Sequence, residues 1–104
     1  MLIRDKDRQS LQAIFASVQT PFEVWAYGSR VTGTAHDTSD IDLVLRTPDL
    51  SPLPMEVLVT LKEKLQDSNI PVTVDLFDWA RLPSAFHANI LNTYEVLFPN
   101  PHAL

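Results

Sequence analysis

The 104-residue chain contains no cysteine and only two glycines, Gly28 and Gly33. The absence of cysteine excludes a disulfide framework, a thiolate nucleophile and a zinc–thiolate site. Basic residues are few: eight Lys and Arg stand against thirteen Asp and Glu, which gives a formal net charge of −5. This acidic balance argues against general nucleic-acid binding and against attachment to a membrane through a basic surface.

Long apolar runs are also absent, so the sequence predicts no membrane span. The N-terminal residues are charged and do not resemble a signal-peptide core. Hydrophobic residues make up 45% and charged residues 20%, which is ordinary for a globular protein. We therefore expect a soluble, cytoplasmic protein with a single domain spanning residues 1–104.

Apolar spacing and turn residues divide the chain into alternating helices and strands. Helical spacing of apolar residues predicts helices at about 5–19 and 54–67 and a short one that includes Leu82, Phe86 and Ile90. Segments rich in β-branched and aromatic residues predict strands at about 22–27, 41–45, 72–77 and 94–98. This order predicts an α/β (α+β) fold, a small mixed β-sheet flanked by helices.

Asp40 and Asp42 are separated by one residue at the start of the expected strand 41–45. Because alternate side chains of a strand share a face, the two carboxylates should lie side by side, with Cα atoms about 6.6 Å apart. Like charges so close raise each other's pKa, and a divalent cation removes that penalty. Oxygen-only ligands suit a hard ion such as Mg²⁺.

Asp75 repeats this arrangement in the expected strand 72–77. If the two strands pair, its carboxylate joins Asp40 and Asp42. Three carboxylates on neighbouring strands match a two-metal site for phosphoryl-type transfer, and Asp75 is then a candidate base. Taken alone, each aspartate is more often a solvated residue, at a strand end for Asp40 and Asp42 and on a half-exposed strand for Asp75.

A second feature is the segment Gly28-Ser29-Arg30, which follows the expected strand 22–27. Backbone N–H groups at a strand-to-helix turn bind anions, and the Ser29 hydroxyl adds a donor. The Arg30 guanidinium suits phosphate oxygens. Gly33 would let the backbone approach a ligand closely. The ordinary alternative is a plain turn with a solvated arginine, and the glycine spacing is not that of a Walker loop.

Together these residues resemble a known motif. Gly28-Ser29, followed after ten residues by Asp40-x-Asp42 within YGSRVTGTAHDTSDIDLVL (27–45), is similar to the DNA polymerase β-type nucleotidyltransferase superfamily. The VDLF segment (74–77) fits the strand of that superfamily that carries a third carboxylate. Because no substrate domain follows, the chain most resembles the minimal nucleotidyltransferases, which are partners of HEPN proteins in bacterial and archaeal toxin–antitoxin modules.

The resemblance implies a nucleotidyltransferase fold and Mg²⁺-dependent transfer of AMP from ATP to a protein hydroxyl. Gly28 and Ser29, with Arg30 at a less diagnostic position, would bind the phosphates of the nucleoside triphosphate. The three aspartates would bind Mg²⁺ and form the catalytic site. The implied acceptor is a tyrosine of a HEPN-type toxin, which AMP addition silences, so that the chain is the antitoxin.

Two other functions stay open. One is a non-catalytic, nucleotide-binding antitoxin that neutralises its partner by forming a complex. The other is a small-molecule nucleotidyltransferase of the antibiotic-modifying kind, although such enzymes normally carry an additional acceptor domain. An acceptor on another chain is compatible with a homo- or hetero-oligomer.

Aromatic and histidine residues near the motif have ordinary interpretations. The aromatic residues on or beside the site strands are expected in the core, with base stacking as the alternative: Trp25, Tyr27, Phe77 and Trp79. The histidines are scattered, without metal spacing: His36, His87 and His102. Phe86, Ile90 and Leu91 are expected to face the core from a short helix, with a residual exposed part as a docking surface.

Overall fold

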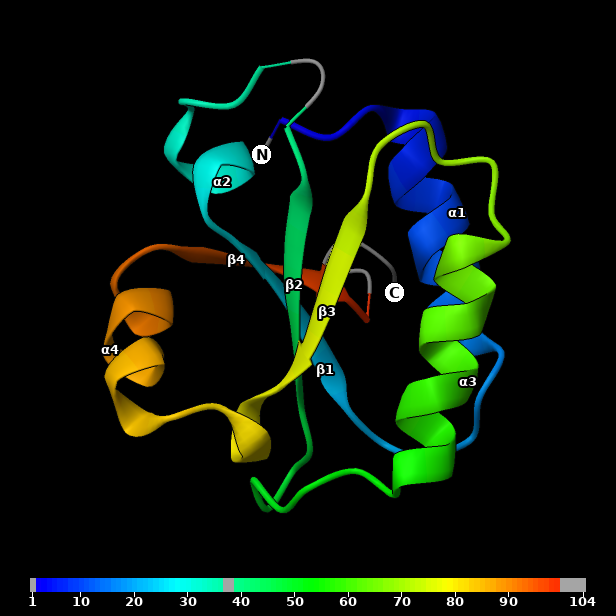
Figure 1. Ribbon diagram of the computed structural model, residues 1–104, viewed down its shortest axis with the longest axis vertical. Helices are drawn as coiled ribbons and strands as arrows, with labels where there is room; N and C mark the ends of the chain where they lie inside the picture. Colours follow the sequence, from blue (N-terminus) through cyan, green and yellow to red (C-terminus); the bar gives the residue numbers. More distant parts are fainter. Residues whose placement is uncertain (1, 37–38, 100–104) are drawn as a thin grey trace.

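The computed structural model describes residues 2–36 and 39–99. Its elements are, in chain order, α1 (Asp5–Ala16), β1 (Glu23–Tyr27), α2 (Ser29–Thr32), β2 (Ile41–Arg46), α3 (Met55–Gln66), β3 (Val74–Asp78), the 3₁₀ helix η1 (Trp79–Arg81), α4 (Ser84–Asn92) and β4 (Tyr94–Phe98) (Figure 1). The three expected helices and four expected strands occur in the expected order, and the structure adds the short helices α2 and η1. Helix α1 ends earlier than expected, because the Ser17 amide and hydroxyl both donate to the Ile14 carbonyl and stop the helix there.

The four strands form one mixed sheet in the order β3-β2-β1-β4. Strand β1 pairs antiparallel with both β2 and β4, and β2 pairs parallel with β3. The parallel register places Asp42 opposite Asp75, and the antiparallel register places Tyr27 opposite Asp42. Strands β3 and β4 are the sheet edges.

One face of the sheet is covered by α1 and α3, which lie on the same side in Figure 1. The helices contribute buried apolar residues at helical spacing: Leu11, Phe15, Leu58, Leu61 and Leu65. They pack against alternate strand residues, among them Leu43 and Leu45 of β2 and Leu76 of β3. This burial is the main hydrophobic contribution to the fold, at roughly 25 cal/mol per Å² of apolar surface removed from water.

The opposite face is covered only in part, by η1 and α4. A second cluster of buried residues lies there: Trp25, Val44, Trp79 and Ile90. The Arg46 guanidinium carbon lies 4.0 Å from the ring centroid of Trp25 and 4.4 Å from that of Trp79. The core assignment of the two tryptophans is therefore confirmed, with a cation held between their rings.

Helix α4 differs from the expectation. Ile90 is buried, but Phe86 and Leu91 are each 52% exposed, so the prediction that all three face the core was wrong. The inward side of the first turn is occupied by His87, whose ring stacks on Trp79 at a centroid distance of 3.9 Å and whose Nε2 lies 2.7 Å from the Trp79 carbonyl. The inward stripe is thus His87 and Ile90, and Phe86 is turned to solvent.

Across the two described ranges, no helix is both long enough and apolar enough to cross a membrane.

Candidate active site

Asp42 and Asp75 lie side by side on the sheet face opposite α1 and α3, at the end of the sheet that η1 and α4 leave open. Their strands are parallel and adjacent, so the two residues are direct register partners. Burial, followed by the charges of Asp75 and then Asp40, raises the pKa of the Asp42 carboxyl. Asp40 is exposed and directly precedes β2. Asp42 is therefore the carboxylate on which the charges of the other two predicted carboxylates act.

The turn between β1 and α2 lies directly against Asp42. Gly28 has φ 77° and ψ −154°, a backbone conformation that is accessible essentially only to glycine. A Cβ at Gly28 would stand 2.5 Å from Asp42 Oδ2, a distance that real Cβ atoms do not tolerate. The lack of a side chain at Gly28 is what allows the carboxylate of Asp42 and the Gly28-Ser29 turn to occupy the same corner of the site.

Ser29 begins the short helix α2, and Gly33 ends it. The Gly28 carbonyl accepts the amides of Val31 and Thr32, both at 3.0 Å, and the Gly33 amide donates to the Ser29 carbonyl at 3.1 Å. Gly33 has φ 88°, and a Cβ there would meet no atom within 4 Å. Glycine is needed at position 33 only for the left-handed conformation that ends the helix. At position 28 it is needed both for the positive φ and for the close approach of Asp42.

Arg30 is buried, and its guanidinium points into the protein. It donates to the carbonyl of Leu2 at 2.9 Å and to the carbonyl of Ser39. Ser39 directly precedes Asp40, so Arg30 ties the N-terminal segment to the entry of β2. The predicted contact of Arg30 with phosphate stays a prediction, and the structure adds a positioning role that the sequence did not reveal.

Tyr27 forms part of the site, which the sequence interpretation as a core aromatic did not anticipate. It is half-buried, directly opposite Asp42 and next to Gly28. Burial, with the charges of Asp42 and Asp75, raises the pKa of Tyr27 to about 12. The Tyr27 hydroxyl therefore stays neutral well above neutral pH, on the residue that is paired with Asp42 in the strand register. Its position as the last strand residue before the glycine turn was the available signal.

The remaining candidate side chains do not join this group. Phe77 follows Asp75 on the same face of β3 and is 40% exposed, so it is not a core residue as expected. His36 is exposed and His87 packs on Trp79. His102 lies outside the described residues.

A divalent cation in a protein needs several oxygen ligands around one position. Within residues 2–36 and 39–99, no three Asp, Glu or His side chains are already arranged around a common metal position. The nearest approach is the pair Asp42 and Asp75, with Asp40 at the rim. Asp42, whose pKa is raised by burial and then by the charges of Asp75 and Asp40, forms with Asp75 a donor set that suits a hard divalent ion.

A mixed sheet with paired carboxylates beside a glycine turn defines the nucleotidyltransferase class. Residues 9–102 match the family described as polymerase beta, nucleotidyltransferase, and the chain belongs to that family. It is 34% identical over 97 residues to the probable protein adenylyltransferase MntA of Haemophilus influenzae, a match that covers 91% of this chain and 82% of the relative. The expected superfamily, its minimal type and the nucleotidyltransferase class of activity are confirmed.

A solved structure described as a toxin-antitoxin with AMP-PNP shares the fold, with a TM-score of 0.72 and 20% sequence identity. The similarity covers 88% of this chain and 73% of that one. The expected nucleotidyltransferase fold is therefore confirmed from both sequence and structure.

Proposed function

We propose that this protein is a Mg²⁺-dependent adenylyltransferase that moves AMP from ATP to a hydroxyl of a partner protein. The observation that carries the proposal is the pair Asp42 and Asp75, held side by side against the Gly28-Ser29 turn. The name of the relative, a probable protein adenylyltransferase, supports a protein acceptor. The structural neighbour is described as a toxin-antitoxin, which supports an antitoxin role.

The finer part of the proposal is the acceptor. The family resemblance implies a tyrosine on a HEPN-type toxin, whose activity AMP addition would silence. This chain would then form a hetero-oligomer with its own substrate.

Asp42 and Asp75, with Asp40 at the rim, are the residues that would hold Mg²⁺, and the ion when bound would neutralise phosphate charge. The Gly28-Ser29 turn would bind the triphosphate through backbone amides and the Ser29 hydroxyl. The Tyr27 hydroxyl would donate a hydrogen bond to a carboxylate or a phosphate oxygen and would keep its proton. Phosphate and carboxylate are both negative, so the triphosphate would bind next to Asp42 and Asp75 only together with cations.

The reaction is an in-line displacement at the α-phosphorus of ATP. The acceptor oxygen forms a bond to the α-phosphorus, and the bond from that phosphorus to the oxygen bridging to the β-phosphorus breaks. Pyrophosphate leaves with the electron pair, and the hydroxyl proton passes to the Asp75 carboxylate. Positioning and charge stabilisation supply most of the rate enhancement in such transfers.

The test is incubation of the purified chain with ATP labelled at the α-phosphate, Mg²⁺ and a co-expressed HEPN-type partner. Covalent label on a partner tyrosine, lost in Asp75→Asn and kept in Asp67→Asn, is the expected result. Asp67 is an exposed aspartate that ends α3, remote from the site, and serves as the matched control. A stable complex that carries no label would instead establish a binding antitoxin.

A further inference from the structure

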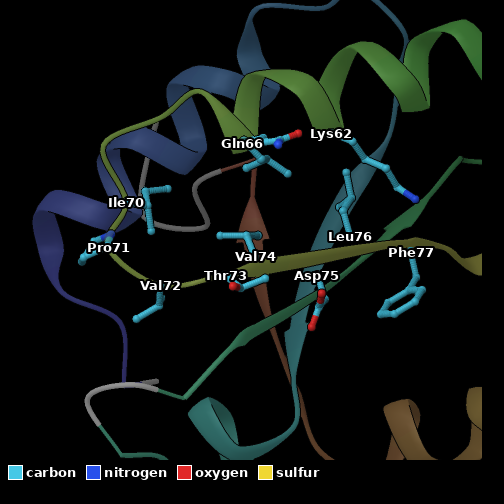
Figure 2. Close-up of a pocket in the computed structure, with 11 residues that line it drawn as sticks. Lys62, Gln66, Ile70, Pro71, Val72, Thr73, Val74, Asp75, Leu76 and Phe77 are labelled. Atoms are coloured by element: carbon cyan, nitrogen blue, oxygen red, sulfur yellow. The ribbon is translucent and has the colours of Figure 1, made fainter.

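A groove with a volume of about 630 Å³ runs along the outer edge of β3, between this strand and helix α3. Figure 2 shows its lining, with Lys62 and Gln66 on the helix side and the β3 residues on the other. Asp75 belongs both to this lining and to the candidate active site. The groove is thus continuous with the proposed site of transfer.

The floor of the groove is an unpaired strand edge. The amide of Ile41 donates to the carbonyl of Thr73, which sets the phase of the parallel ladder. Thr73, Asp75 and Phe77 accordingly direct their backbone groups toward β2, whereas Val74 and Leu76 direct theirs toward the groove. Among the described residues, no hydrogen bond is made by the outward amides of Val74 and Leu76. Alternate outward donors and acceptors are complementary to an extended peptide.

The side chains along this edge alternate between two environments. Figure 2 shows Val74 and Leu76 pointing toward α3, and Asp75 and Phe77 pointing to the other face. A strand added at this edge would alternate in the same way, because side-chain direction has a period of two residues. A residue of the added strand on the Asp75 face would therefore bring its side chain to the carboxylates.

The charges of the groove select the neighbour of that residue. Lys62 and Asp75 are the charged residues of the lining, and Lys62 lies on the α3 side, where Val74 and Leu76 point. An added residue on that side would face the Lys62 ammonium. Because consecutive residues alternate, it would directly precede or follow the residue that faces Asp75.

We propose that the open edge of β3 binds the acceptor protein through an extended segment, in which a hydroxyl-bearing residue faces Asp75 and an adjacent acidic residue faces Lys62. This inference rests on the proposed function and names how its substrate is held. The backbone supplies affinity through main-chain hydrogen bonds, and Lys62 supplies selection of an acidic sequence.

The test uses two synthetic probes, poly(Glu,Tyr) and poly(Lys,Tyr), with the intact chain. Hydrogen exchange of backbone amides is followed by NMR. We expect poly(Glu,Tyr) to slow exchange at Val74 and Leu76, and poly(Lys,Tyr) to leave both unchanged. Because the net charge of the chain is −5, unspecific attraction would produce the opposite order of the two probes. Unchanged exchange with poly(Glu,Tyr), or equal protection by both, would overturn the proposal.

Two charge reversals on the same helix sharpen the test. Lys62→Glu should weaken poly(Glu,Tyr) binding about tenfold, since it replaces an attraction by a repulsion. Lys64→Glu changes the net charge equally, but Lys64 lies outside the groove and bonds the Ser17 hydroxyl, so binding should stay within about twofold. Equal loss in both variants would contradict a role of Lys62.

The readouts separate this inference from the proposed function. If poly(Glu,Tyr) protects the β3 edge but no labelled AMP reaches the partner protein, the docking proposal stands and the transferase proposal is refuted. If labelled AMP reaches the partner but the amides of Val74 and Leu76 are not protected, the transferase proposal stands and the docking proposal is refuted.

Discussion

The carboxylates at the two ends of the paired strands β2 and β3 differ in their hydrogen bonding. At one end, Asp78 is buried and accepts hydrogen bonds from the amides of Leu53 and Ala80 and from Arg81 Nε, at 2.9 to 3.2 Å. At the other end, Asp42 lies between two further carboxylates, and the structure shows no hydrogen bond to it from any described residue. The same pair of strands thus holds one carboxylate with several hydrogen-bond donors, Asp78, and one without any among the described residues, Asp42. We call them the satisfied and the frustrated carboxylate.

The difference in hydrogen bonding distinguishes a carboxylate that stabilises the fold from one that is available for function. A buried carboxylate with several donors is a structural group, because its hydrogen bonds offset the loss of hydration. Asp42 has no such compensation, and its raised pKa records the cost. An electrostatically unfavourable group next to a glycine-only turn is typical of a site that awaits a charged ligand.

The largest effect should come from removing the frustrated carboxylate. Asp42→Asn should lower the rate of AMP transfer about a thousandfold or more, because it would remove one of the carboxylates proposed to hold the cation. The fold should be unaffected, since no hydrogen bond is lost. Initial rates of label incorporation, together with circular dichroism of the variant, measure both effects. Transfer at the wild-type rate would mean that Asp42 is not a metal ligand.

Removal of the satisfied carboxylate should have the inverse result. Asp78→Ala leaves the buried amide of Leu53 without its acceptor and should cost about 2–4 kcal/mol of unfolding free energy. Urea denaturation measures this loss, with the exposed Asp67→Ala as the control. The transfer rate per folded molecule should stay close to that of the wild type. A stability loss that is equal in both variants would show that the hydrogen bonds of Asp78 do not stabilise the fold.

The two glycines near Asp42 allow the effect of backbone strain to be separated from the effect of a clash with its carboxylate. Gly28→Ala and Gly33→Ala both force a side chain into a positive φ and should each cost about 1–3 kcal/mol. Only the Cβ at Gly28 meets the Asp42 carboxylate, so only Gly28→Ala should also impair transfer. Thermal unfolding and transfer rates of the two variants check this. Equal activity losses would show that backbone strain alone is responsible.

The smallest effect is a pH dependence of stability. The pKa of Asp42 is raised above its ordinary value of 3.8, so its ionisation opposes folding. Its contribution to stability is fully present below that value and is lost as the pH rises through the folded-state pKa. Relative to Asp42→Asn, the wild type should therefore become less stable as the pH rises from about 3.5 to neutrality. An opposite or absent trend in urea midpoints would contradict the repulsion.

Local patterns predicted most of the framework. Helical spacing in Leu58, Leu61 and Leu65 identified α3, and all three residues are buried. Strand alternation put Ile41 and Leu43 on the face opposite to Asp42, and both are buried.

The errors occurred where packing depends on distant elements. Phe86 and Leu91 have core composition, but the inward side of α4 is taken by His87 against Trp79. Tyr27 reads as a core aromatic, and it does pack against the cluster of Trp25 and Val44, but it is only half-buried and lies opposite Asp42 in the strand register. Apolar spacing identifies a face, and it does not reveal whether another element covers that face.

What the sequence determined by itself is local. Side-chain alternation along β2 places Asp42 on the face opposite to Ile41 and Leu43, and a glycine permits the turn at Gly28, because alternation and backbone sterics act within a few residues. The tertiary structure alone decided that β3 pairs in parallel with β2 so that Asp75 faces Asp42, with Gly28 against the same carboxylate. The hydrophobic pattern fixes which face of each strand is buried, but the pairing of two strands that a helix separates also depends on how both pack onto one core.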